Sequence, residues 1–224
     1  MASVTRNCLV CGTLSTKSCA VCKTASYCDA EHQKQVRSKD GTQYQWFVIN
    51  SSVSPLRFLQ DWRSHKEYCC KIKAAGANTF DAILFPVNET KPRLVKIPWK
   101  LIPGDEYEPM PYQRLDTDIW FKHTPKCVRN RLIRQLGING PELGRTLTFI
   151  YDDNFSINES PLNHCVVEVT GGRAAYPWCG NILALRMDSE KTYAYGFYTD
   201  VDMQEDLKLF VTYFEEYATV KPIR

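Results

Sequence analysis

The chain has 224 residues and a net charge of only +3, with 44% hydrophobic and 12% aromatic residues. This composition excludes a disordered chain and leaves room for one medium domain and a smaller one. The charge is uneven, because residues 1–74 hold 11 Lys and Arg against 5 Asp and Glu, while the remainder holds 17 against 20. The longest apolar stretch, Phe80–Val87, is too short to cross a membrane.

The ten cysteines bear on the compartment in which the chain works. A secretory signal has a positively charged start, an apolar run and a cleavage site of small residues. The first residues of this sequence do not show this pattern. The cysteines fall in pairs with interspersed histidines, at spacings typical of metal sites rather than of a disulfide framework. We therefore expect an intracellular protein, nuclear or cytoplasmic, with no membrane segment.

Four pairs of Cys and His residues stand in the first seventy positions. They are Cys8 and Cys11, Cys19 and Cys22, Cys28 and His32, and His65 and Cys69. Two cysteines separated by two residues aim both thiolates at one ion, and a pair separated by three residues projects from one face of a helix. The eight ligands suffice for two closed tetrahedral zinc sites. They can be divided in sequence order or by interleaving, and the short interval between Cys22 and Cys28 favours interleaving.

Residues 1–73 are predicted to form a metal module of two knuckles and two short helices. The helices are expected at Tyr27–Gln35 and Asp61–Ala74, each carrying one ligand pair. The module has too few apolar residues for an independent core, so metal must supply the free energy of folding. A structural zinc ion contributes roughly 10–16 kcal/mol in such modules.

Residues 78–220 are predicted to form an α+β domain. Strands are expected at Phe80–Phe85, Arg93–Ile97, Thr146–Tyr151, Cys165–Val169 and Tyr193–Tyr198, and Trp178–Met187 fits either a strand or a helix.

Two helices are expected in this second domain. In Lys126–Leu136 the apolar residues recur at helical spacing and Gly137 follows as a stop. At the C-terminus, Thr199 and Asp202 match a capping pattern before an amphipathic helix. Its apolar stripe consists of Leu207, Phe210, Val211, Phe214 and Tyr217.

The ligand pattern closely resembles the MYND zinc finger over residues 8–69, and it matches that family at Tyr27, Gln33, Trp62 and Lys66 as well. The resemblance implies that one zinc ion is held by Cys8, Cys11, Cys28 and His32. It implies that a second zinc ion is held by Cys19, Cys22, His65 and Cys69. The family usually has Cys where this chain has His32, which is also a good zinc ligand.

The chain departs from the family by 25 extra residues between Gln33 and Trp62. Deleting Val36–Gln60 restores the family spacing without moving a ligand, although other windows of this length do the same. Valine codons begin with GT and glutamine can be encoded by CAG, which suits intron boundaries. We therefore hypothesise that residues 36–60 are a translated retained intron or a gene-model error. Sequencing the transcript tests this, and a mature message that always keeps the segment would contradict it.

The resemblance implies a protein–protein interaction module, because MYND fingers dock short proline-containing peptides. Gln33 and Trp62 are the expected groove residues, since an exposed indole beside an amide can hold a proline ring and a backbone carbonyl. Four protein ligands on each zinc leave no open position for a substrate, which excludes metal catalysis in this module. The leading interpretation is a zinc-dependent adaptor or regulatory protein.

Two other functions stay open at this point. An enzyme would need its active site in residues 78–220, where His123 or His164 would serve as a base. The nucleophile would be Cys127, Cys165 or Cys179. Leu162–Cys165 is similar to part of the SET methyltransferase motif Asn-His-Ser-Cys-x-Pro-Asn but lacks its serine and its Pro-Asn, so we interpret it as chance. Nucleic-acid binding is the lesser alternative, because no basic helix with base-reading side chains accompanies the basic module.

Overall fold

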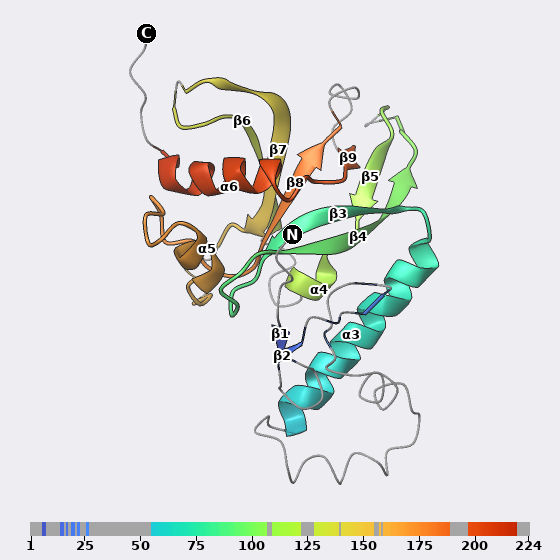
Figure 1. Cartoon of the computed structure of the whole chain (residues 1–224). Coiled ribbons are helices and arrows are strands. Elements are labelled where there is room, and N and C mark those ends of the chain that lie inside the picture. The colour runs from blue at the N-terminus through green and yellow to red at the C-terminus, as the bar shows by residue number, and fades with distance from the viewer. Residues whose placement is uncertain are drawn as a thin grey trace, which may run out of the picture. The chain divides into compact units, whose positions relative to one another are not determined.

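The computed structural model describes most of the chain after residue 54. The described residues are 6–7, 14–15, 17, 19–20, 22, 26, 55–106, 109–121, 128–138, 140–154, 157, 159–188 and 197–218, with only the backbone given for 6–7, 14 and 55–64. The chain divides into two compact units, Met1–Gly76 and Ala77–Arg224. Figure 1 shows both units.

The first unit contains a small two-stranded ribbon and one long helix. Strand β1 (Arg6–Asn7) pairs antiparallel with β2 (Leu14–Ser15). Helix α3 spans Pro55–Ala75 and starts at a proline, which suits the first turn of a helix because proline lacks the backbone N–H. Gly76 follows with a φ of +57°, a left-handed conformation that commonly ends helices.

Helix α3 corrects one sequence expectation and extends another. The predicted helix Asp61–Ala74 exists but begins six residues earlier, at Pro55. Residues 55–60, which belong to the extra segment 36–60, therefore form the first turns of α3. The predicted helix Tyr27–Gln35 lies outside the described residues, and so does the segment 36–54.

The second unit is a curled antiparallel sheet with few helices. Its seven strands run in the order β5-β4-β3-β8-β7-β6, with β9 pairing to β8 beside this path. The strands are β3 (Thr79–Phe85), β4 (Arg93–Ile102), β5 (Tyr112–Leu115), β6 (Val128–Gln135), β7 (Glu142–Asp152), β8 (Ile182–Met187) and β9 (Tyr198–Thr199).

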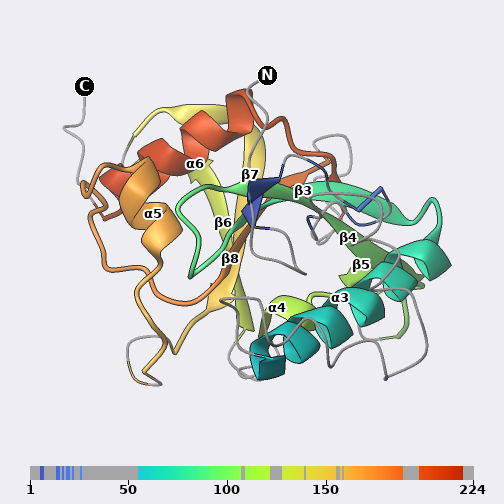
Figure 2. The ribbon, with the colours of Figure 1, turned by 60° about the horizontal axis from the view of Figure 1, so that its bottom comes forward.

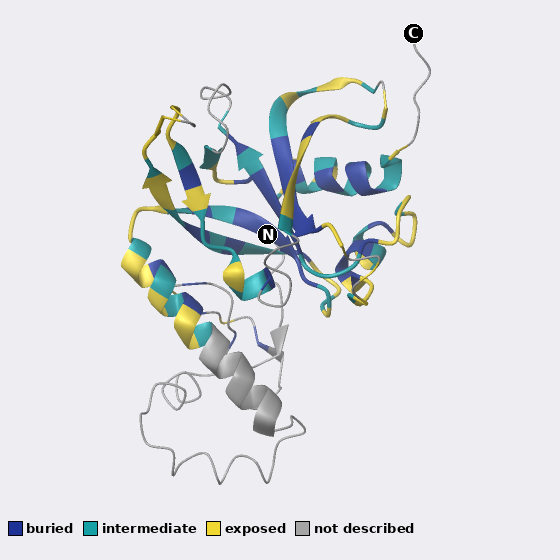
Figure 3. Cartoon of the chain, turned by 180° about the vertical axis from the view of Figure 1, so that it is seen from behind, coloured by how far each residue is buried: buried dark blue, intermediate teal, exposed yellow. Residues whose placement is uncertain are grey.

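Both faces of this sheet carry buried apolar side chains, because successive strand residues point to opposite faces. On β3, Ile83 and Phe85 belong to one hydrophobic cluster, whereas Phe80, Ala82 and Leu84 belong to another. The continuous apolar run of β3 thus reflects a strand covered on both sides. Figure 3 shows the buried residues gathered in the middle strands, with exposed residues toward the hairpin ends.

Three short helices cover these two faces. Helices α5 (His164–Val169) and α6 (Glu205–Glu216) contribute to the cluster that contains Phe85 and Phe149, and α4 (Asp118–Phe121) contributes Phe121 to the other cluster. Figure 2 shows α5 and α6 together on one side of the sheet. The predicted C-terminal helix is confirmed, but its predicted cap was wrong, because Thr199 lies in β9; the Asp202 side chain instead accepts from the backbone N–H groups of Gln204 and Glu205 at 2.7 and 3.0 Å.

The predicted helix Lys126–Leu136 was wrong, because Val128–Gln135 is strand β6. It pairs antiparallel with β7 from Val128↔Asp152 to Gln135↔Glu142, with a register shift after Ile133. Leu132, which helical spacing placed in an apolar stripe, is 42% exposed, while its neighbour Ile133 is 2% exposed. The β7 ladder therefore outweighs the local helical pattern.

The predicted strand Cys165–Val169 was also wrong, because His164–Val169 is helix α5. Asn163 begins this helix: its side-chain oxygen accepts from the Val166 N–H at 2.9 Å. The uncertain segment Trp178–Met187 resolves as strand from Ile182 onward. Of the predicted strand Tyr193–Tyr198, only the end is described, where β9 begins at Tyr198.

Candidate metal centre

Helix α3 presents two metal-binding residues on one face. His65 and Cys69 are four positions apart, which places them one turn apart on the same side of a helix. Tyr68 and Ile72 share this side and are buried, whereas Lys66, Glu67 and Cys70 are exposed. The helix therefore turns His65 and Cys69 inward and leaves the Cys70 thiol in solvent.

Two further cysteines come from the segment after β2. Cys19 is 3% exposed and Cys22 is fully buried. Ala20 and Cys22 lie in turns, at the spacing from which we expected a knuckle. Although many residues separate this knuckle from α3 in the sequence, the fold brings the two ligand pairs together.

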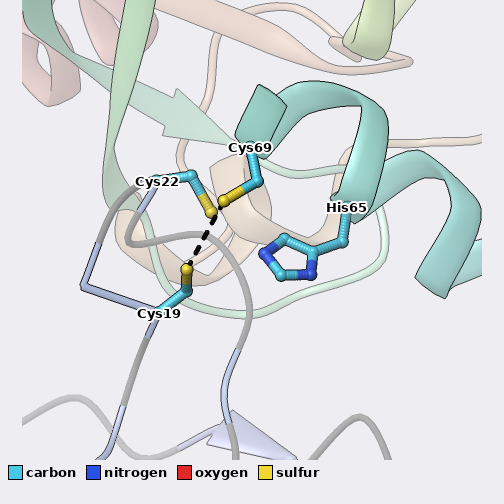
Figure 4. A group of neighbouring side chains, drawn as sticks. All are labelled: Cys19, Cys22, His65 and Cys69. Carbon is cyan, nitrogen blue, oxygen red and sulfur yellow. Dashed lines mark hydrogen bonds between the residues drawn. The ribbon is translucent and has the colours of Figure 1, made fainter. Parts of the chain in front are cut away.

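The four side chains form a Cys3His cluster. One ligand atom from each of Cys19, Cys22, His65 and Cys69 lies within 4.8 Å of all the others. Figure 4 shows the imidazole and the three thiols turned toward one another. The Sγ atoms of Cys19 and Cys69 are 3.8 Å apart, much longer than the roughly 2.05 Å of a disulfide bond. A tetrahedral zinc with Zn–S bonds of about 2.3 Å separates two sulfur ligands by about 3.8 Å.

The electrostatics of the cluster also suit a cation. Burial, and then the neighbouring Cys19, raise the pKa of the Cys69 thiol to about 11. Near neutral pH the Cys69 thiol therefore holds its proton unless a positive charge replaces it, because burial and a neighbouring thiolate both disfavour its ionised form. Metal binding to such thiols therefore releases protons.

The donor set fits a metal ion that prefers soft ligands. Three sulfurs and one imidazole at tetrahedral spacing are typical of structural zinc. The cluster could hold one such ion, and its four protein ligands would leave no position for a substrate. A metal in this site would stabilise the first unit rather than catalyse a reaction.

The remaining predicted ligands and groove residues are not placed by the structure. Cys8, Cys11, Cys28 and His32 lie outside the described residues, as does Gln33. Trp62 lies on α3 one turn before His65, where only the backbone is described. The first predicted zinc site and the predicted peptide groove therefore stay predictions.

The described candidates for a catalytic pair do not form one. His164 and Cys165 are neighbours on α5, but His164 is exposed and Cys165 is fully buried. Burial raises the pKa of the Cys165 thiol to about 12, the opposite of what a nucleophilic thiolate needs. Burial also raises the pKa of Cys179, whose thiol donates to the Pro177 carbonyl at 3.3 Å. His123 and Cys127 lie outside the described residues.

The residues that resembled part of the SET motif have a structural role instead. Asn163 is fully buried, and its side-chain nitrogen donates to the carbonyls of Phe85 and Gly180 at 3.0 and 2.7 Å. It caps α5 with its oxygen at the same time. This side chain therefore joins β3, the loop before β8 and the start of α5.

One polar cluster escaped the sequence reasoning. Arg131 on β6 donates from Nε to the Tyr213 hydroxyl at 2.6 Å and lies 4.8 Å from the centre of the Tyr217 ring. The expectation of a helix over residues 126–136 hid this contact. Strand alternation places Arg129, Arg131 and Ile133 on one face, so a strand assignment would have pointed to it.

Comparison with known proteins found no matching family model, no matching curated protein and no matching solved structure. Among the described residues, none of the helices has both the length and the apolar character needed to cross a membrane.

Proposed function

We propose that the first unit is a MYND-type finger with two zinc ions and that it docks proline-containing peptides of partner proteins. On this proposal the protein is a zinc-dependent adaptor or regulator. The observation that carries the proposal is the Cys3His cluster of Cys19, Cys22, His65 and Cys69. These are the four residues that the resemblance assigns to the second zinc ion.

The long interval between the two ligand pairs strengthens this reasoning. A short local motif can bring neighbouring cysteines together by chance, but Cys22 and His65 are separated by more than forty residues. The cost of closing a loop grows slowly with its length, so the extra segment is compatible with a closed site. The other zinc ion would be held by Cys8, Cys11, Cys28 and His32.

Metal content of the purified full-length protein tests the finger. We expect two zinc equivalents per chain by elemental analysis, and loss of about one equivalent in Cys69→Ala. The matched control is Cys70→Ala, which removes the exposed neighbouring thiol and should keep both ions. Loss of about one equivalent in Cys28→Ala tests the other ligand set, that of Cys8, Cys11, Cys28 and His32. Fewer than two equivalents in the wild type would contradict the two-zinc assignment.

Peptide binding is a separate test of the partner class. We expect proline-containing peptides on an array to bind the wild-type protein and to bind Trp62→Ala at least about tenfold more weakly. The control is Lys66→Ala, an exposed position one turn later on the same helix. Equal binding by the two variants would count against a groove at Trp62 even if zinc content is normal.

A further inference from the structure

Among the described strands, the sheet of the second unit ends at β6. The strand order stops at β6, which pairs with β7 on one side only among the described strands. The outer edge of such a strand presents backbone N–H and C=O groups that can pair with another extended chain. The side chains on this edge strand include three exposed arginines.

Three arginines stand on β6, and all three are exposed: Arg129, Arg131 and Arg134. None of them lies within ion-pair distance of a carboxylate among the described residues. Four arginines elsewhere in this unit do have acidic partners. Arg93 pairs with Glu89, Arg145 with Glu205 and Asp206, Arg173 with Glu215, and Arg186 with Asp206. The β6 edge therefore concentrates positive charge that the fold does not neutralise.

The side chain of Arg131 is held in place by aromatic residues rather than by an acid. Its Nε donates to the Tyr213 hydroxyl at 2.6 Å, and its guanidinium lies 4.8 Å from the centre of the Tyr217 ring. The Tyr213 and Tyr217 rings are themselves in contact, with centroids 5.7 Å apart. A guanidinium fixed in this way loses less conformational entropy on binding a carboxylate, and it keeps its full charge for that purpose.

We propose that the β6 edge binds an acidic, extended segment of a partner protein as an added strand. Backbone hydrogen bonds from β6 would hold the segment, and its alternate carboxylates would reach the arginines. Arg129 and Arg131 lie on one face of the strand, so carboxylates on that face of the added strand find two partners, and Arg134 lies at the register shift that follows Ile133.

Two other occupants fit the observations less well. A second copy of this chain would place the arginines of one β6 against those of the other, which like-charge repulsion opposes. Nucleic acid would approach a part of the chain, residues 75–224, that carries 17 basic against 20 acidic residues. An acidic peptide needs only the local charge of the strand and also uses the backbone groups of its edge. This inference concerns the second unit and does not depend on the zinc finger.

The test uses the full-length protein and a fluorescent octapeptide in which glutamate alternates with valine. We expect fluorescence anisotropy to show binding that weakens at least about tenfold when lysine replaces glutamate in the peptide. Methylating alternate backbone nitrogens of the acidic peptide keeps its charge but removes strand pairing. Two methylated peptides are compared, one modified at the odd positions and one at the even positions. Only the peptide whose methylated nitrogens face β6 should bind more weakly, by a similar factor.

Arginine variants locate the site. Arg131→Gln should weaken binding of the acidic peptide about tenfold, and so should the double variant Arg129→Gln with Arg134→Gln. The double variant leaves the Tyr213 contact intact, so it separates binding from local folding. The matched control is Arg114→Gln, an exposed arginine on β5 at the opposite edge of the sheet, which should bind normally.

Three outcomes would overturn the proposal. The first is that the acidic and basic peptides bind equally, or that neither binds at millimolar concentration. The second is that both N-methylated peptides bind as well as the unmethylated peptide, which would reduce the interaction to charge alone. The third is that a single-stranded oligonucleotide binds more tightly than the acidic peptide and depends on the same arginines, which would make the edge a nucleic-acid site.

Discussion

Asn163 connects three parts of the second unit through one buried amide. Its side-chain nitrogen donates to the carbonyls of Phe85 and Gly180, and its oxygen caps α5 at the Val166 N–H. Its backbone N–H also donates to the Trp178 carbonyl at 2.8 Å. The bonds to Phe85 and Val166 are buried and the bond to Gly180 is partly buried, so water compensates poorly for their loss.

Replacing this side chain should destabilise the second unit strongly. We expect Asn163→Ala to lower the free energy of unfolding by about 2–4 kcal/mol, since a helix cap and two buried hydrogen bonds are lost. Asn163→Asp keeps the cap acceptor but sets a carboxylate against two carbonyls, and it should be at least as harmful. Urea unfolding curves measure both variants, with the exposed neighbour His164→Ala as the control. A change in Asn163→Ala no larger than in His164→Ala would contradict this role.

The cysteines should differ widely in reactivity. The pKa of Cys165 is raised by burial to about 12, so at pH 8 about one thiol in ten thousand is ionised. Cys70 is exposed on α3. We expect iodoacetamide at pH 8 to modify Cys70 and to spare Cys165 until denaturant is added, as followed by peptide mass spectrometry. Comparable rates at the two sites in the native protein would show that Cys165 is more accessible than the structure implies.

At the candidate site, the sequence predicts contacts between residues that are close in the chain better than contacts between distant residues. Two cysteines separated by two residues, and His65 with Cys69 one turn apart, are determined by nearby backbone geometry. These local signals predict the ligand pairs, whereas the grouping of Cys19, Cys22, His65 and Cys69 is what the resemblance to the finger implies, and in the structure these four residues could hold one metal ion. The contact between Arg131 and Tyr213 joins residues far apart in the chain, and no short pattern records it.

At the scale of elements, β6 shows how pairing overrides periodicity. Its apolar residues recur at helical spacing, yet the strand is fixed by hydrogen bonds to β7 that no local pattern reveals. Helix α5 shows the reverse, because a run rich in valine reads as a strand until the Asn163 cap is considered. Strand β3 and helix α6 were predictable, because a continuous apolar run and a long amphipathic stripe each admit few alternatives.

The β6–β7 hairpin depends on glycine at one position. A Cβ atom added to Gly140 would overlap the backbone oxygen of Leu136, which no rotamer change can relieve. We expect Gly140→Ala to lower the free energy of unfolding by about 1–3 kcal/mol as the turn distorts. Gly144→Ala, within β7, is a matched control, since no atom outside its immediate neighbours lies within 4 Å of the added Cβ.

Thermal unfolding of the two glycine variants provides the comparison. Gly144→Ala should be neutral or slightly stabilising, because alanine reduces the freedom of the unfolded chain. Equal melting temperatures for the two variants would mean that the turn adapts to a side chain at residue 140.

At the scale of the whole molecule, the two units differ in what stabilises them. The two hydrophobic clusters on the faces of the sheet are built from residues at and beyond Phe80. The first unit instead has the Cys3His cluster, and protonated thiols without a metal ion would contribute little to its stability. Its stability should therefore follow the metal.

Removing zinc should unfold the first unit and leave the second one folded. We expect a strong chelator to abolish hydrogen-exchange protection in α3 while the amides of β3, β7 and β8 stay protected, as measured by mass spectrometry. The double variant His65→Ala with Cys69→Ala should reproduce the exchange pattern of α3 without chelator. Loss of protection throughout the sheet would contradict separate stabilisation of the units.

The strand order has a consequence for the protein as it is being made. Cys69 completes the described ligand cluster before the sheet begins, but Ile83 of β3 pairs with Ala184 of β8, nearly half the chain later. At about 5–20 residues per second, β3 waits on the order of 5–20 s for this neighbour. During that time it can pair only with β4, and its apolar side chains are uncovered on both faces. The growing chain thus passes through a stage in which the complete ligand cluster is followed by an unfinished β3–β4 ribbon with exposed apolar side chains, which is where chaperones would be needed most.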